Sequence, residues 1–293
     1  MIDYMIYPKI FVSVFTFLCG CCIGSFLNVL IYRIPIGMDF KKGRSMCFTC
    51  KHQLHAIDLV PLFSWIFLGG KCRYCKAKIS AQYPIVEALT GILFTAAYWL
   101  GTGCKINLAF FGYCIAISAL IVTTVIDFRT MEIPDSMWIT VFIGALFVYG
   151  QELIDDGGFD LDCFLARFIG FFAASGVLFI LALITKGGMG GGDIKLMAAC
   201  GFLLGWKQVI LALIMGAVIG TLYLVFTAIK NKGKVPRKVP FAPHLSIAVV
   251  ICIFAGERIL QWYFDLCGIT PHVHDHDHEA VIMMLNTLAN LIK

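Results

Sequence analysis

Long apolar runs are the feature that most constrains this chain, because a segment crossing lipid must satisfy its own backbone hydrogen bonds and does so as a helix. The 293 residues are 60% hydrophobic and 14% charged, whereas soluble domains are about 45–50% apolar and about 25% charged. We therefore predict an all-α polytopic membrane protein with about eight transmembrane helices. The runs cover residues 10–31, 85–100, 108–126, 137–149, 164–184, 194–206, 209–229 and 245–262.

Two of these runs, 137–149 and 194–206, are shorter than the roughly 17–25 residues of a normal span. The second of them is interpreted either as a short helix sheltered by its neighbours or as a re-entrant segment, since irregular backbone at membrane depth needs protein cover. Residues 1–7 lack a basic region, and no small-residue cleavage site follows the first run. The first helix is therefore expected to be retained.

The charges of the loops predict the orientation. The loop at residues 35–82 contains two acids, Asp39 and Asp58, and eight bases, which places it in the cytoplasm. Counting the spans onward from this loop places the acidic loop at 152–162 outside and the basic cluster at 230–238 inside. The charges of the loops agree with this orientation only if run 194–206 crosses the membrane. The net charge of +5 forms no nucleic-acid patch, so no nucleic-acid partner is expected. The bases of the first loop are Lys41, Lys42, Arg44, Lys51, Lys71, Arg73, Lys76 and Lys78.

Two aspartates fall at the same predicted depth. Asp127 ends the third run and Asp193 begins the sixth, both at the cytoplasmic side of this topology. An acid at such a position is costly, and two that share a water can hydrolyse a peptide bond when one carboxyl is ionised and the other protonated. Alternatively, each caps a helix or lies among the headgroups, and Asp193 is well placed as an N-cap. An extended substrate backbone would explain the glycine run Gly187, Gly188, Gly190, Gly191 and Gly192.

These residues resemble a known family. Gly190-x-Gly192-Asp193 matches the GxGD pattern of intramembrane aspartic proteases, and the surrounding stretch 188–196 is similar to the second active-site motif of bacterial type IV prepilin peptidases. Their first site, an Asp followed by Ile-Pro-Asp or Ile-Pro-Asn, corresponds to Asp127 and the sequence at 133–135. The resemblance implies catalysis by Asp127 and Asp193, support from Gly190, Gly192 and Lys195, and no cofactor for proteolysis.

Four cysteines of the first loop have metal-ligand spacing. Cys47-x2-Cys50 and Cys72-x2-Cys75 are separated by 21 residues. Thiolates at four tetrahedral corners predict a structural Zn2+ site that closes a loop too polar to fold on its own core. Redox dithiols or unliganded thiols are the alternatives, and catalytic zinc is disfavoured because four thiolates leave no open position.

The resemblance continues around this loop. Residues 24–35 are similar to the N-terminal signature of the bifunctional prepilin peptidases, and residues 83–87 match their Tyr-Pro-x-x-Glu. In that family this half is associated with methylation of the new amino terminus by S-adenosylmethionine. Departures are Gln82, Phe48 and Ala242, where Arg, Pro and Gly are usual. The resemblance implies methyltransferase or cofactor roles for Gly24, Asn28, Arg33 and Glu87. From the residues alone, Asn28, Arg33 and Glu87 either bind cofactor and amine or are polar groups at helix ends.

The tail lies beyond the resemblance. His272, His274, His276 and His278 alternate along the chain and either bind a divalent metal in an extended conformation or form a polar linker. Residues 280–292 have apolar residues at helical spacing, as in a helix on the membrane surface. We predict three regions: 1–106 with the cysteine loop, 107–264 with the peptidase, and the tail 265–293.

The expected function is cleavage of the leader peptide of a prepilin or pseudopilin at the cytoplasmic face of the bacterial inner membrane, with N-methylation from S-adenosylmethionine. The expected partners are that substrate and the lipid bilayer; no pattern specifies an oligomeric state. A protease without methyltransferase activity is a second reading. The rival class is a transporter or assembly scaffold that uses Asp127 and Asp193 as ion or proton sites, which leaves the cysteine loop unexplained.

Overall fold

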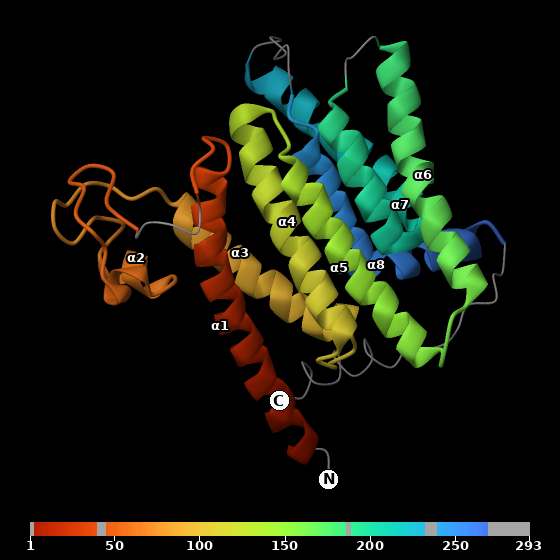
Figure 1. Cartoon of the computed structure of the whole chain (residues 1–293), viewed down its shortest axis with the longest axis horizontal. Coiled ribbons are helices and arrows are strands. Elements are labelled where there is room, and N and C mark those ends of the chain that lie inside the picture. The colour runs from red at the N-terminus through yellow and green to blue at the C-terminus, as the bar shows by residue number, and fades with distance from the viewer. Residues whose placement is uncertain (1–2, 40–44, 186–188, 232–238, 269–293) are drawn as a thin grey trace. The chain divides into compact units, whose positions relative to one another are not determined.

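The computed structural model describes residues 3–39, 45–185, 189–231 and 239–268, and these are nearly all helical (Figure 1). Outside the described residues lie several features of the sequence analysis: the bases at 41–44, Gly187 and Gly188, most of the basic cluster, and the histidines and apolar segment of the tail. The predicted all-α class is confirmed. The elements are α1 (Asp3–Arg33), η1 (Ala56–Leu59), α2 (Phe63–Phe67), α3 (Gln82–Ala96), η2 (Ala97–Gly101), α4 (Leu108–Thr130), α5 (Asp135–Asp155), α6 (Leu161–Ile184), α7 (Gly191–Lys230) and α8 (Ala242–Leu266).

The chain forms two compact units, Met1–Ala96 and Ala97–Lys293, called here unit 1 and unit 2. Unit 1 contains α1, α3 and the cysteine loop between them. Unit 2 contains the helices from η2 to α8. The division predicted between residues 106 and 107 falls in the loop that precedes α4, and the three predicted regions stay a prediction.

In unit 1, α1 packs closely on α3 through small residues. A Cβ atom on Gly20 would lie 2.7 Å from the Cα of Gly91, and one on Gly24 would lie 2.7 Å from the Cα of Glu87. The two glycines are four residues apart and share one face of α1. This is the small-residue spacing that lets membrane helices approach backbone to backbone, and it brings α1 directly against α3 beside Glu87.

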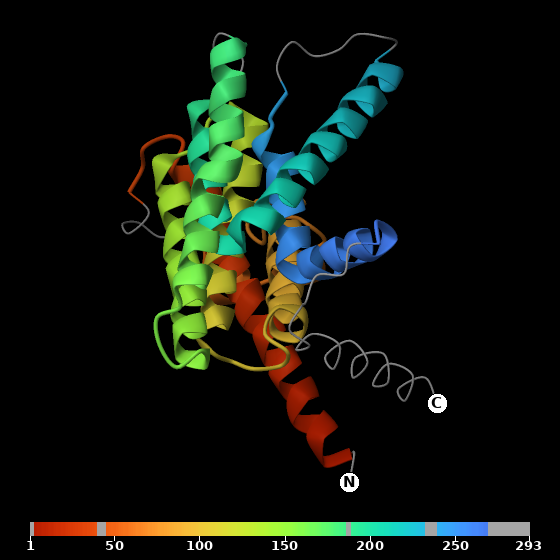
Figure 2. The same ribbon diagram turned by 90° about the vertical axis from the view of Figure 1, so that its right-hand side faces the viewer.

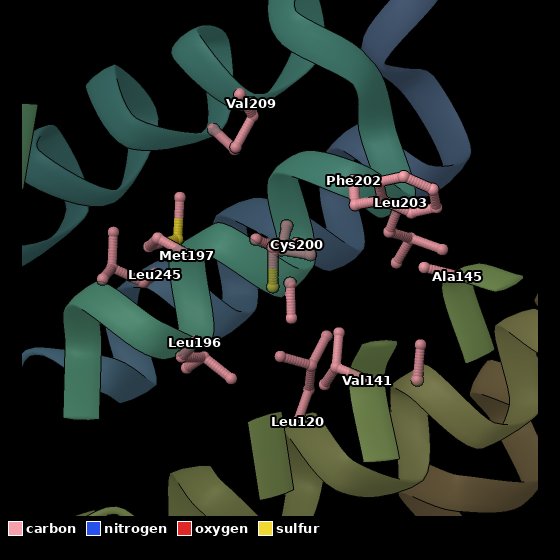
Figure 3. Close-up of a cluster of buried hydrophobic side chains, with 14 of the residues drawn as sticks. Leu120, Val141, Ala145, Leu196, Met197, Cys200, Phe202, Leu203, Val209 and Leu245 are labelled. Atoms are coloured by element: carbon pink, nitrogen blue, oxygen red, sulfur yellow. The ribbon is translucent and has the colours of Figure 1, made fainter. Parts of the chain in front are cut away.

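In unit 2, one end of the bundle collects several helix termini. The C-terminal ends of α4 and α6 and both ends of α7 lie at the top of Figures 1 and 2. The first part of α7 is the centre of the core, as Figure 3 shows with Leu196, Met197 and Cys200 between α4, α5 and α8. Since these three side chains are fully buried, this part of α7 is fixed by its neighbours.

Helix α7 consists of two arms. It runs through 40 residues, but Gly205 has φ 76° and ψ 168°, which interrupts the helix. The predicted runs 194–206 and 209–229 are these two arms, so the described residues contain seven helices long and apolar enough to cross a membrane, against eight runs in the sequence. From Gly191 to the break, the first arm rises only about 20 Å at about 1.5 Å per residue, less than the roughly 30 Å hydrocarbon core. The first arm is a short helix covered by its neighbours, and its crossing of the membrane stays a prediction.

Arg167 of α6 stabilises the break. Its Nη1 donates to the carbonyl oxygens of Phe202 and Leu203, both at 2.8 Å, and its Nε donates to Glu152 Oε2 at 2.7 Å. These carbonyls end the first arm, where no intrahelical donor follows. A buried arginine therefore satisfies backbone that lipid would leave without partners.

Replacing this arginine should destabilise unit 2. We expect Arg167→Met to cost about 3 kcal/mol, because removal of one partner leaves the other polar groups of a buried pair uncompensated. Thermal unfolding of the detergent-solubilised protein, followed by tryptophan fluorescence, measures the effect. Lys230→Met, at the exposed end of α7, is the control and should unfold like the wild type. An unfolding temperature of Arg167→Met equal to that of the control would contradict this role.

Candidate functional site

Asp127 lies in the last turn of α4 and is 5% exposed. Met131 follows in the left-handed conformation with φ 56°, and its N–H donates to the carbonyl oxygen of Asp127 at 3.0 Å, which ends the helix. The N–H of Ala242, the first residue of α8, donates to the Asp127 carboxylate. The Oδ2 atom is buried and accepts no hydrogen bond from the described residues. One carboxylate oxygen is therefore held in the interior without a partner.

Asp193 lies in the first turn of α7 and is 8% exposed. The N-cap is Gly190, so the interpretation of Asp193 as the N-cap is wrong. The Asp193 carboxylate instead accepts the N–H of Gly190, as a third helical residue does when it reaches back to the cap. Its Oδ1 atom is buried and has no partner among the described residues.

The two aspartates form one site. Asp127 is in the last turn of α4 and Asp193 in the first turn of α7, and these two helix ends lie at the same end of unit 2 (Figure 1). Asp193 is within electrostatic range of Asp127. The N-terminus of α8 is at Asp127 and that of α7 is at Asp193, and such ends favour negative charge. Buried polar atoms without partners are rare and call for an explanation. Two such carboxylate oxygens in one place can together bind a water and polarise a carbonyl group.

The glycines before Asp193 differ in the space around them. A Cβ atom on Gly192 would lie 2.7 Å from the Cβ of Ile133, which precedes α5, whereas one on Gly191 would meet nothing within 4 Å. A Cβ atom on Gly190 would lie 3.2 Å from Asp193 Oδ2. The first and third glycines of the motif thus allow close packing around Asp193, and the middle position is open.

Lys195 acts at a distance from the pair. Its Nζ lies 2.7 Å from Asp135 Oδ1, and the same oxygen accepts Trp138 Nε1 at 3.0 Å. Both charged side chains are more than half exposed. This ion pair joins the start of α7 to the start of α5, which are the two segments that meet at Gly192 and Ile133.

The contribution of Ala242 was missed by the sequence analysis. The residue was noted only as a departure within Pro240-Phe241-Ala242-Pro243. Two prolines predict the start of a helix, and the N–H groups of a first turn have no intrahelical acceptor. That signal indicates an available donor but not its acceptor, which lies in α4.

The four cysteines of unit 1 come together as predicted. The sulfur atoms of Cys47, Cys50, Cys72 and Cys75 all lie within 4.8 Å of one another, with 3.8 Å between Cys47 Sγ and Cys75 Sγ. A tetrahedron with Zn–S bonds of about 2.3 Å has edges of about 3.8 Å. The cluster is therefore compatible with zinc.

Each pair of cysteines sits on the same kind of hairpin. Cys47 N–H donates to His52 O at 2.9 Å and Cys72 N–H donates to Ala77 O at 2.8 Å. Lys51 and Lys76, the residues after each second cysteine, both have positive φ, at 58° and 59°. The backbone N–H of Cys50 lowers the pKa of the Cys47 thiol to about 6. Its thiolate, the form that binds metal, is thus available near neutral pH.

Asp58, in η1 between the two hairpins, contacts the second hairpin. Its carboxylate is 3% exposed and accepts Arg73 Nε at 2.6 Å and Tyr74 Oη at 3.0 Å, both from the second hairpin. It also accepts the His55 N–H at 3.2 Å. Burial opposes ionisation of Asp58, but these donors outweigh it and hold the pKa of the carboxyl below its ordinary value. The charge of Asp58 is thereby neutralised by partners within the loop.

A cavity of about 720 Å³ lies in unit 1 between the helices and the cysteine loop. Asn28, Arg33 and Glu87 line it, so three of the four methyltransferase candidates share one cavity. Gly24 is not among the lining residues and serves instead in the contact of α1 with α3. A volume of roughly 300–1,000 Å³ is typical of small-molecule sites.

All three candidates that line the cavity are held by hydrogen bonds within unit 1. Asn28 is 1% exposed, and its Nδ2 donates to Tyr83 O at 3.2 Å. Glu87 is 7% exposed, and its Oε2 accepts the N–H of Leu62 at 2.7 Å. Arg33 Nη1 donates to Asp39 O at 3.0 Å. The three side chains are therefore fixed in the cavity wall.

The fold and the two sites define a multi-pass helical membrane protein with a buried aspartate pair and a four-cysteine loop. Residues 18–100 match the family described as the bacterial peptidase A24 N-terminal domain, and residues 114–225 match the type IV leader peptidase family. The chain belongs to this family of leader peptidases.

Curated relatives cover nearly the whole chain. A prepilin leader peptidase/N-methyltransferase of Bacillus subtilis is 35% identical over 85% of this chain and 97% of its own length. Proteins of the same name from Aeromonas hydrophila and Neisseria gonorrhoeae are 32% and 31% identical over 84% and 83% of this chain, and 92% of each relative. No solved structure matches.

Proposed function

We propose that the protein removes the leader peptide of type IV prepilins or pseudopilins with Asp127 and Asp193. The observation that carries this proposal is the pair of buried carboxylate oxygens without partners at one end of unit 2. One ionised aspartate deprotonates a water, and the other, protonated, donates to the carbonyl oxygen of the scissile bond. Gly190 and Gly192 hold Asp193 in place, and Lys195 ties the start of α7 to α5.

The basic loop at residues 35–82 is expected in the cytoplasm of a protein of the bacterial inner membrane. Counting spans from that loop supports a cytoplasmic position for the end of unit 2 that contains the aspartates. A prepilin carries a short basic leader followed by an apolar helix, so its leader stays in the cytoplasm while the helix lies in the bilayer. The bond between the two then lies at the depth of the aspartate pair. The transporter reading is not favoured, because it assigns no role to the cysteine loop.

We further propose that unit 1 methylates the new amino terminus. The relatives are named N-methyltransferases, and Asn28, Arg33 and Glu87 line a cavity of suitable size. S-adenosylmethionine would supply the methyl group there. Zn2+ held by the four cysteines would fix the two hairpins. Their residues, from Ser45 to Thr49 and around Arg73, form a wall of that cavity.

One experiment tests both activities. The purified protein is incubated with a prepilin and labelled S-adenosylmethionine, and the product is examined by mass spectrometry. Loss of the leader mass together with gain of one methyl label is expected. Cleavage without a methyl label would support the peptidase activity and refute the methyltransferase activity. An unchanged prepilin would refute the proposed function.

Zinc removal should separate the activities. We expect Cys47→Ser to lower bound zinc severalfold or more and to impair methylation, because the hairpin wall of the cavity loses its crosslink. Leader cleavage should change much less, since the aspartates belong to unit 2. Metal content by mass spectrometry and the assay above give the readouts, with Cys104→Ser, outside the cluster, as the control. Zinc-free wild type, purified without chelator, would contradict the zinc assignment.

A further inference from the structure

Glu87 is a buried acid in the cavity of unit 1, and no cationic side chain in the part of the chain that the structure describes pairs with it. Three ion pairs of the described residues join Arg73 to Asp58, Arg167 to Glu152 and Lys195 to Asp135, and none of the three includes Glu87. Asp58, the other acid that lines the cavity, is neutralised by Arg73. Buried charges in proteins are normally paired. Among the described residues, Glu87 is therefore an acid of the cavity that no ion pair neutralises.

The position of Glu87 is built rather than accidental. Its Oε2 accepts the N–H of Leu62, whose φ of 62° is unusual for a branched residue. The Ser25 side chain of α1 also hydrogen-bonds to the carboxylate. Donors from the loop and from α1 thus hold the carboxylate in the cavity wall. Backbone held in a rarely populated conformation is a common feature of binding sites.

The cavity also offers aromatic faces. The ring of Tyr32 stacks on that of Tyr83 with centroids 6.0 Å apart and lies 5.3 Å from the ring of Phe48. All three residues line the cavity. Aromatic faces attract cations, including organic cations with methyl groups. An acid and aromatic rings in one apolar cavity favour a positively charged organic ligand.

We propose that Glu87 is the anionic site for the organic cation in methyl transfer, an inference that rests on the proposed methyltransferase function. Two groups carry that charge: the sulfonium of S-adenosylmethionine and the ammonium of the cleaved peptide. In the reaction the bond from sulfur to the methyl carbon breaks with its electron pair remaining on sulfur. The amine lone pair forms the new nitrogen–carbon bond, and the amine releases a proton to water. The donor thereby becomes a neutral thioether and loses its attraction to Glu87.

The test compares ligands that differ in this charge. Titration calorimetry on the full-length, zinc-loaded protein measures binding of S-adenosylmethionine and of neutral S-adenosylhomocysteine. The variant is Glu87→Gln, which keeps the size of the side chain and an oxygen to accept the Leu62 N–H. The control is Asp156→Asn, an exposed acid at the end of α5. Zinc content and leader cleavage show that each variant is folded.

Two results support the proposal and identify the cation. If it is the sulfonium, Glu87→Gln binds S-adenosylmethionine about tenfold more weakly and S-adenosylhomocysteine unchanged, as expected for loss of a buried charge interaction. If it is the peptide ammonium, both ligands bind unchanged and the KM for cleaved peptide in methylation rises about tenfold. Equal weakening of both ligands, or no change in any quantity, overturns it.

A second variant tests the cavity if Glu87→Gln does not fold. Ile36 lines the cavity, lies beyond the end of α1 and is 66% exposed, so Ile36→Trp fills space without entering the core. It should weaken both ligands about tenfold or more; wild-type binding by this variant excludes the cavity as the site. Wild-type protein that neither binds the donor nor methylates would instead refute the methyltransferase function itself.

Discussion

Asp127→Asn and Asp193→Asn each abolish leader cleavage, with rates at least about 10³-fold below the wild type, within the range lost when a general acid or base is removed. Asparagine keeps the shape of the side chain but cannot exchange the proton that the reaction needs. The burial of both carboxylates and their unpartnered oxygens are the reason to expect equal severity. Conversion of a reconstituted prepilin, followed by mass spectrometry, gives the rates.

Two controls make this result specific. Glu132→Gln removes an exposed acid from the loop between α4 and α5 and should cleave at the wild-type rate. Both aspartate variants should insert into membranes and still methylate a pre-cleaved peptide, because the cavity with Glu87 is in unit 1. Cleavage at the wild-type rate by either aspartate variant would refute the two-aspartate mechanism.

Substitutions along the glycine motif should have graded effects. Gly192→Ala places a Cβ atom 2.7 Å from the Cβ of Ile133, about 1 Å inside the usual carbon–carbon contact of about 3.5–4.0 Å. The start of α7 must then shift, and a misplacement of about 1 Å in a catalytic site costs on the order of 10²-fold in rate. Gly190→Ala, with 3.2 Å to Asp193 Oδ2, should lose severalfold.

Gly191→Ala is the matched control, since its Cβ atom meets nothing within 4 Å. It makes the same chemical change one residue away and should cleave nearly as fast as the wild type. Steady-state cleavage rates of the three variants, at equal amounts of inserted protein, give the order. A loss for Gly191→Ala as large as that for Gly192→Ala would show that the motif needs glycine for chain flexibility rather than for packing against Ile133.

The helices, and the position of both aspartates at one end of unit 2, could be predicted from the sequence because both depend on local patterns; the membrane depth of the aspartates stays a prediction. Apolar length defines a span, and loop charges orient it. The cysteine tetrad followed from spacing alone. The two arms of α7 were predicted as separate runs, but the break at Gly205 that joins them could not be predicted from the local pattern. That break is stabilised by Arg167, which is more than thirty positions away in the sequence.

The contacts that shape the sites depend on which helices are neighbours, and no local pattern states this. The donor from Ala242 to Asp127, the packing of Gly192 on Ile133 and the pairing of Lys195 with Asp135 each join distant segments. Lys195 was predicted as catalytic support, but the spacing did not reveal that its partner is in α5. In unit 1, the four-residue spacing of Gly20 and Gly24 indicates close packing of α1 on another helix. The family resemblance assigned Gly24 to the methyltransferase candidates, so its packing on α3 was not predicted.

The division into two units has a consequence for how such enzymes can diverge. Each described group around the aspartates, in α4, the start of α5, the start of α7 and the start of α8, is encoded after residue 96. The cavity and the cysteine loop are encoded before it. On the proposed function, a gene that loses, replaces or mutates its first third still encodes every described group around the two aspartates, so selection can act on the methyl modification separately from the cut.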